Sequence, residues 1–159
     1  MRKTFLLIWF ILCFASVYSQ TTSDQTDSID TKINDSKILA SSNPAEATQK
    51  LLELKSHSEK IQYKYGVMQS AMGLVLIYYN DGNYKKTIEE SQVVEQYAKE
   101  LNDDIYLSDT YRMKANAYGE MGLVKECLEE LQKALPVIDK IKDPGRRFYR
   151  KALIYETYS

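Results

Sequence analysis

The chain of 159 residues has only one histidine, two cysteines, one tryptophan and three prolines. Because His57 is the only histidine, no metal cluster of histidine, cysteine and carboxylate ligands and no catalytic histidine pair can be assembled. His57 lies in a polar stretch between Lys55 and Glu59, so we expect it to be solvated. From these shortages we expect no bound metal, no cofactor and no enzymatic activity.

The sequence also lacks the strict alternation of apolar and polar residues that marks a half-buried strand. Without strands, no glycine-rich phosphate loop can connect a strand to a helix. The charges nearly balance, with 21 basic and 22 acidic residues. A nucleic-acid-binding domain would show a basic surplus, so we expect no nucleic-acid partner.

The first residues have the pattern of a secretory signal peptide. Arg2 and Lys3 precede an apolar run at residues 5–14, and Val17 and Ser19 are small enough for a signal peptidase. The run is too short for an uncleaved membrane anchor, which needs roughly 20 apolar residues. We therefore predict a signal peptide at residues 1–19, cleavage after Ser19, and a periplasmic or extracellular protein without a stable membrane span.

Cleavage would leave Cys127 as the only cysteine, so no disulfide could form within the chain. Loss of Arg2 and Lys3 would leave 19 basic against 22 acidic residues, a net charge of −3. Residues 20–28 are polar and cannot offset the entropy of becoming ordered, so we expect a flexible leader there. Burial and helix packing must then stabilise residues 29–159 as one domain.

What the chain does contain is a repeat. Tyr78, Tyr118 and Tyr158 lie 40 residues apart, and Gly82 matches Gly122 at the same interval. A pattern that recurs at a fixed interval of this size indicates an array of repeated units.

Apolar residues three and four positions apart predict helices throughout residues 29–159. The clearest stripe consists of Val124, Leu128, Leu131, Leu135 and Ile138. With turns at capping and helix-ending residues, the predicted helices are 29–41, 44–59, 62–80, 84–101, 104–120 and 123–141, and a seventh begins near Arg146. Pro136 should kink the sixth helix without ending it.

Three features recur with these helices: a late tyrosine in each first helix, a glycine before each second helix, and a small residue one turn into it. The small residues are Ala47, Thr87 and Cys127. Together they resemble the tetratricopeptide repeat (TPR) over residues 29–159. The resemblance implies an all-α, right-handed α-solenoid of antiparallel hairpins, with three hairpins and an incomplete fourth.

The interval of 40 residues exceeds the family's usual ~34, and the family's first-helix tryptophan, leucine and glycine are replaced by Ala71, Leu74 and Val75. A HEAT-like hairpin array, whose repeats are nearer this length, is an alternative.

In TPR arrays the first helices line a concave groove, so the resemblance implies a protein- or peptide-binding surface. By spacing, its candidate residues are Gln69, Met72, Leu76, Tyr79, Asp109, Arg112, Asn116 and Glu120. Any solenoid face can look like this. Arg112 and Asn116 resemble part of the family's carboxylate clamp, but Ala152 and Leu153 stand where further clamp residues would be needed, so we reject the clamp.

One local concentration of positive charge surrounds two aromatic residues, Phe148 and Tyr149. Its members are Lys140, Lys142, Arg146, Arg147, Arg150 and Lys151. The cluster could face an anionic lipid surface or an acidic partner, or it could complement a helix C-terminus and face water.

The function that we expect is an exported, non-enzymatic scaffold that binds a protein or a peptide. The incomplete last hairpin would also allow end-to-end self-association. The alternatives are the sensory region of a larger membrane-anchored signalling or transcription-regulating protein, and an accessory subunit of an enzyme.

Overall fold

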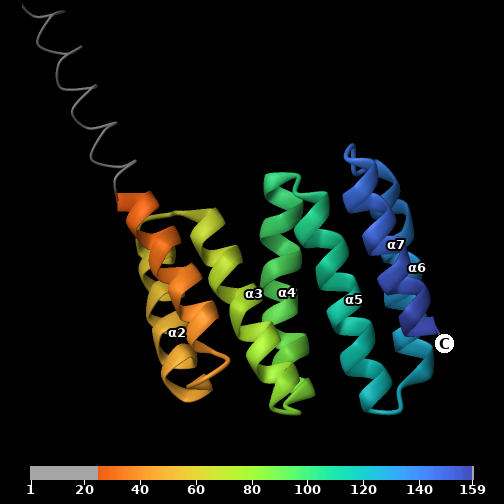
Figure 1. Cartoon of the computed structure of the whole chain (residues 1–159), viewed down its shortest axis with the longest axis horizontal. Helices are drawn as coiled ribbons and strands as arrows, with labels where there is room; N and C mark the ends of the chain where they lie inside the picture. Colours follow the sequence, from red (N-terminus) through yellow and green to blue (C-terminus); the bar gives the residue numbers. More distant parts are fainter. Residues whose placement is uncertain (1–24, 159) are drawn as a thin grey trace, which may run out of the picture.

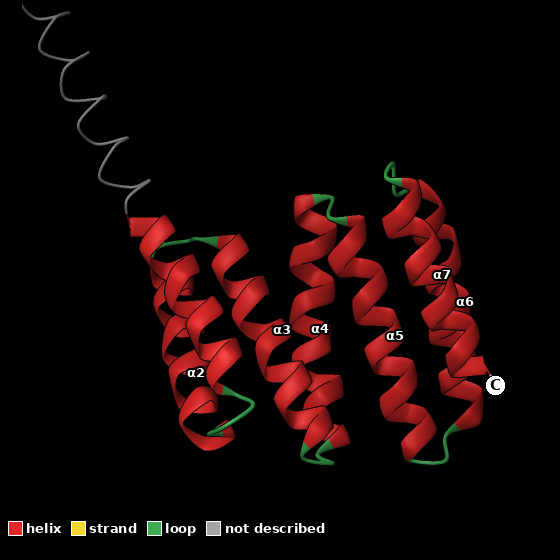
Figure 2. Cartoon of the chain, viewed as in Figure 1, coloured by secondary structure: helices red, strands yellow, loops and turns green. Residues whose placement is uncertain are grey.

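The computed structural model describes residues 25–158, and this part of the chain consists of helices and short turns without strands (Figure 2). Residues 25–39 are helical, and six further helices follow: α2 (Pro44–Lys60), α3 (Lys64–Asn80), α4 (Tyr84–Leu101), α5 (Asp104–Glu120), α6 (Val124–Lys140) and α7 (Pro144–Tyr158). The expected all-α class is confirmed. The predicted signal peptide and its cleavage site lie outside the described residues.

The helices are evenly spaced along the chain. From α2 to α7 a new helix begins every 20 residues, so each pair of helices occupies 40 residues. This is the interval between the three tyrosines, which all lie in the last turn of a first helix.

Four consecutive turns, from the one before α3 to the one before α6, each contain one residue in the left-handed conformation. Gly82 and Gly122 both have φ of 72°, which confirms the helix-ending role expected of these glycines. Gln62 and Asn102 have φ of 57° and 54° at the matching positions. The left-handed residue therefore recurs every 20 residues, whether or not it is glycine.

Polar side chains cap several helix N-termini. The Oδ1 atoms of Asn43 and Asn83 accept hydrogen bonds from the backbone N–H groups of Glu46 and Lys86, each at 3.2 Å. Asp103 caps α5 in the same way and accepts two backbone N–H bonds at 3.0 Å. These caps satisfy N–H groups that have no partner within the helix.

The expected flexible leader needs correction at its C-terminal end. Residues 25–28 are helical, whereas residues 20–24 lie outside the described part of the chain. Ile29 and Ile33 are buried, and they hold the first helix against its neighbours. Once these residues are fixed, extending the helix by one turn costs little, because each added residue gains a backbone hydrogen bond.

The helices form a row of hairpins, with residues 25–39 at one end and α7 at the other (Figure 1). Consecutive helices pack against each other, and α3 also contacts α5, which in turn contacts α7. Among the described helices α2, α4 and α6 make no such contacts with one another. The first helices therefore approach each other more closely, and they form what we call the inner layer.

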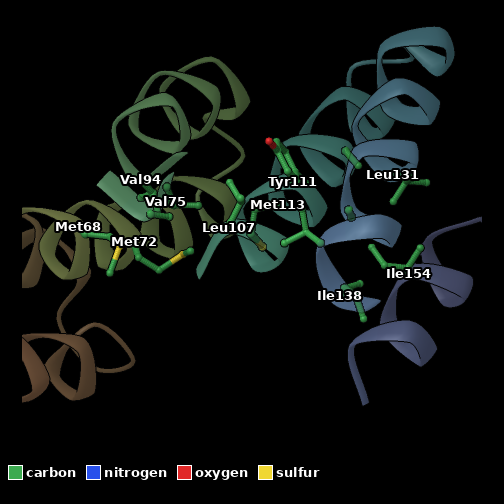
Figure 3. Packing of buried hydrophobic residues seen from close by; sticks show 14 of the residues in the cluster. Met68, Met72, Val75, Val94, Leu107, Tyr111, Met113, Leu131, Ile138 and Ile154 are labelled. Carbon is green, nitrogen blue, oxygen red and sulfur yellow. The ribbon is translucent and has the colours of Figure 1, made fainter. Parts of the chain in front are cut away.

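Two apolar clusters hold the row together. The larger joins α3 to α7 and includes Met72, Tyr111 and Ile154, and the smaller joins residues 25–39 to α2 and α3. Ile154 of α7 lies beside side chains of α6 (Figure 3). The small residues Ala47 and Thr87 are fully buried, as expected where two helices cross closely.

The predicted apolar stripe of α6 is only partly buried. Leu131 and Ile138 belong to the core, but Val124 and Leu128 are exposed. The buried face is turned toward Ala134 and its neighbours, because α6 packs against both α5 and α7 rather than against one partner. Exposed Pro136 lies within α6, and the helix continues beyond it as predicted.

No described helix is long and apolar enough to cross a membrane.

Candidate functional site

A cavity of about 450 Å³ lies on the inner layer where α3, α5 and α7 come together. Its lining residues are Tyr79, Arg112, Ala115, Asn116, Gly119, Glu120, Cys127, Leu153, Glu156 and Thr157. We call it the inner cavity. It brings together four of the eight predicted groove residues: Tyr79, Arg112, Asn116 and Glu120.

Arg112 supplies the positive charge of the inner cavity. Its side chain is half-buried on α5, and its Nε atom is buried without a hydrogen-bond partner. No carboxylate within residues 25–158 forms an ion pair with it. Leaving a buried donor unsatisfied costs about 1–3 kcal/mol, so this guanidinium is suited to an external acceptor.

Asn116 lies one helical turn after Arg112. Its Oδ1 atom is 3.1 Å from the Oγ1 of Thr157 on α7, which donates to it or to the Leu153 carbonyl at 3.0 Å. With its oxygen facing that hydroxyl, the Asn116 amide directs its NH2 group elsewhere, where it can donate to a ligand. The inner cavity therefore offers donors from two neighbouring side chains.

The lining of the inner cavity also includes acidic and aromatic residues. The hydroxyl of Tyr84 donates to Glu120 at 3.4 Å, and the rings of Tyr79 and Tyr84 lie 5.7 Å apart. Burial and the Glu120 carboxylate raise the pKa of Tyr79, although the charge of Arg112 opposes them. Tyr79 therefore stays protonated at neutral pH and presents a hydroxyl group and a ring face to a ligand.

The other four predicted groove residues lie outside the inner cavity. Gln69 is buried and accepts a hydrogen bond from the Lys37 Nζ at 3.0 Å. Met72 is buried in the larger cluster, and Asp109 forms an ion pair with Arg150 at 2.7 Å.

Leu76 is exposed and lines a separate cavity of about 460 Å³, whose lining comes mainly from α3 and from the end of the first helix. The helical spacing assigned Leu76, Gln69, Met72 and Asp109 to one surface with the other four. It could not show that neighbouring helices cover Gln69 and Met72.

The predicted groove residues included none from α7. Thr157 and Leu153 line the inner cavity from α7, and Thr157 lies 41 residues after the Asn116 that it contacts. The repeat interval was the available signal, because it places α7 beside α5 as it places α5 beside α3.

The basic cluster is divided by ion pairs. Arg150 pairs with Asp109, and Lys151 pairs with Asp139 on α6 at 2.6 Å. Arg147 lies 3.5 Å from the backbone carbonyl of Ile141. The remaining members, Lys140, Lys142 and Arg146, are exposed. Part of the cluster therefore ties α7 to α5 and α6 instead of forming one continuous cationic surface.

Neither His57 nor Cys127 forms a reactive centre in this arrangement. His57 is exposed, as expected, and lies 3.4 Å from Gln25. Cys127 is half-buried in the wall of the inner cavity, and burial raises the pKa of its thiol. Within the part of the chain that the structure describes, no three potential ligand side chains are grouped as a metal site.

A further cavity of about 790 Å³ lies between the first helix and α2. It is open and combines apolar residues such as Ile29 and Leu54 with exposed charged residues such as Lys32. None of the predicted groove residues lines it.

Comparisons of the chain with protein-family models, with curated proteins and with solved structures gave no match.

Proposed function

We propose that this protein is an exported, non-enzymatic, TPR-like module that binds a segment of a protein partner in the inner cavity. The proposed architecture is a right-handed α-solenoid, supported by the 40-residue period and by the closer approach of the first helices. Export is supported by the predicted signal peptide at residues 1–19.

The observation that carries the proposal is the unpaired guanidinium of Arg112 in a cavity between three helices. Other basic residues with buried nitrogen atoms on these helices have acidic partners: Lys114 pairs with Glu95, and Arg150 with Asp109. A carboxylate on the partner would give Arg112 the bidentate geometry that guanidinium groups favour.

The surrounding groups define the chemistry of the partner further. Glu120 and Glu156 also line the inner cavity, so a ligand with several negative charges would be repelled there. A peptide segment with one acidic group for Arg112 and neutral polar groups for Asn116 fits better. The ring of Tyr79 can pack against an apolar side chain of the same segment.

Binding rather than catalysis is also supported by the state of Cys127. Its thiol is the nucleophile of the inner cavity, but burial raises its pKa and so reduces the fraction of reactive thiolate.

The test is selection of peptides by the purified protein from a displayed library with acidic, neutral and basic residues at every position. We expect enrichment of segments with one acidic group. Replacing Arg112→Met should weaken binding of the selected peptides about 10- to 100-fold, because it removes a charged hydrogen bond worth about 1.5–3 kcal/mol.

Arg146→Met is the matched control, since Arg146 is exposed at the start of α7 and lies outside the inner cavity. It removes the same charge and should leave affinity unchanged. Equal losses in both variants would show a non-specific charge effect. Selected peptides that bind Arg112→Met as tightly as the wild type would exclude the inner cavity as the binding site.

A further inference from the structure

The helix α7 carries exposed apolar residues at positions that are buried in the preceding first helices. Met68 in α3 is 0% exposed, and Ser108, 40 residues later in α5, is 2% exposed. Phe148 occupies the same position in α7 and is 76% exposed. The third residue of this series is the largest and the least covered.

A second series repeats the pattern two turns later. Val75 in α3 and Ala115 in α5 are fully buried, whereas Tyr155 in α7 is 61% exposed. Phe148 and Tyr155 are seven residues apart and so lie on one face of α7. In α3 the equivalent face packs into the larger cluster with residues of α4 and α5. The face of α7 has the register of a packing face without a neighbour over it.

The helix α6 lies at the same end of the row and also carries exposed apolar residues (Figure 1). Tyr84 begins α4 and reaches Glu120 in the following hairpin, so this position faces the next repeat. Val124 is its equivalent 40 residues later and is 65% exposed. Leu128, one turn further along α6, is also exposed. We define the end face by Val124, Leu128, Phe148 and Tyr155.

We propose that the end face packs against the end face of a second copy of this protein, so that two arrays join in a two-fold symmetric dimer. Phe and Tyr side chains each bury about 150–250 Å² in an interface. Two copies of Phe148 and Tyr155, with the flanking apolar residues of α6, form the apolar centre of an interface of about 800 Å² per partner.

The exposed residues of the first helix favour this occupant over a head-to-tail contact with that helix. In the first helix, residues 25–39, Ile38 is the one large apolar side chain that is exposed. The remaining exposed positions there are polar, including Thr31, Asn34 and Asp35. Burying Phe148 and Tyr155 against such groups would leave the polar groups without water, at a cost in free energy. A second end face avoids this cost, and a symmetric contact closes instead of propagating into a filament.

The test is the molar mass of the purified protein by sedimentation equilibrium across the micromolar concentration range. We expect the wild type to dimerise. The double substitution Phe148→Glu and Tyr155→Glu should raise the dissociation constant at least about thirtyfold, because it places charges at the centre of the interface. Both residues are exposed in one copy, so the folded protomer should be preserved, which circular dichroism checks.

Tyr149→Glu is the matched control. Tyr149 is 61% exposed, as Tyr155 is, and it lies on the same helix but on a different face. This variant should dimerise like the wild type. A wild-type protein that is monomeric throughout, or a double variant that dimerises as strongly as the wild type, would overturn the proposal.

The alternative occupant of the end face is a membrane surface, and binding to vesicles that contain anionic lipid tests for it. If the wild type is a monomer that co-sediments with them and the double variant does not, the end face is a membrane-binding surface and the dimer is excluded. Peptide selection through Arg112 is independent of these results, because the inner cavity lies on a different face from the end face.

Discussion

The Nζ atom of Lys114 on α5 lies 3.0 Å from the Oε1 atom of Glu130 on α6, and both side chains are less than one-tenth exposed. The same Nζ atom lies 3.0 Å from the Oε2 of Glu95 on α4. Burial alone would lower the pKa of Lys114, but hydrogen bonds to Glu130 and Glu95 raise the pKa above its ordinary value. One ammonium group therefore connects three consecutive helices.

The first prediction concerns the loss of this ammonium. Lys114→Met leaves the buried Glu130 carboxylate with its contact to Lys133, and the half-buried Glu95 carboxylate with its contacts to Lys99 and Tyr111. We expect the free energy of unfolding in urea to fall by about 3 kcal/mol. Lys125→Met is the control, because Lys125 is 85% exposed and 3.9 Å from its acidic neighbour. Equal stabilities of the two variants would contradict the prediction.

The second prediction concerns pH. Burial alone would raise the pKa of Glu95, but hydrogen bonds from Lys99 and Lys114 hold it below 4.5. A carboxyl group whose pKa is lowered by folding stabilises the folded protein at pH values above the pKa of that group in the unfolded state. This contribution disappears as the pH falls through the folded-state pKa. Glu95→Gln should therefore be less stable at neutral pH and lose less stability than the wild type on acidification below 4.5.

Urea unfolding at neutral pH and at several acidic pH values measures this difference. Glu129→Gln, at an exposed position of α6, should follow the wild-type profile. Parallel profiles for the wild type and Glu95→Gln would show that the Glu95 ion pairs do not contribute to the acid sensitivity.

The third prediction concerns the turns. Gly82 has φ of 72°, so Gly82→Ala forces a side chain into the left-handed region and should cost about 1 kcal/mol or more. Gln62 has φ of 57° at the equivalent turn, so Gln62→Gly should stabilise the protein. This gain should be smaller than the loss in Gly82→Ala, because glycine also makes the unfolded chain more flexible. Thermal unfolding compares the two variants, and changes of the same sign would refute the shared-turn explanation.

The fourth prediction concerns Pro136, which is exposed in the interior of α6 and has no N–H group for the helix. Pro136→Ala should raise the free energy of unfolding by about 2 kcal/mol. Pro44→Ala is the control, since Pro44 is the first residue of α2, where no intrahelical N–H bond is lost. A destabilised Pro136→Ala variant would mean that neighbouring packing depends on the proline.

The helices were predictable from sequence because their ends carry strong local signals. Asn43 before Pro44 and Gly82 before Asn83 mark helix starts through the chemistry of single side chains, and the structure places α2 and α4 there. Gln62 gave no such signal, because glutamine rarely adopts a left-handed conformation. The predicted third helix accordingly began at residue 62, inside this turn, whereas α3 begins at Lys64.

The candidate site was predictable only in part, because burial depends on residues distant in sequence. Gln69 and Arg112 both lie on first helices and both are polar. Lys37 satisfies Gln69, whereas no described residue pairs with Arg112. Which of two similar positions is covered depends on the neighbouring helices. The apolar pattern of α6 likewise specified a stripe that included Val124 but not which edge of it would be exposed.

The uniform 20-residue step between helix starts has a consequence for the history of such a chain. Each described helix from α2 to α7 contacts only the next helix or the next but one, so duplication of a 40-residue segment inserts one hairpin and leaves the more distant contacts unchanged. Duplication of a segment whose length is not a multiple of the 20-residue step would instead interrupt a helix and expose its apolar face. Lengthening by whole hairpins therefore preserves the existing contacts while adding new surface to the inner layer.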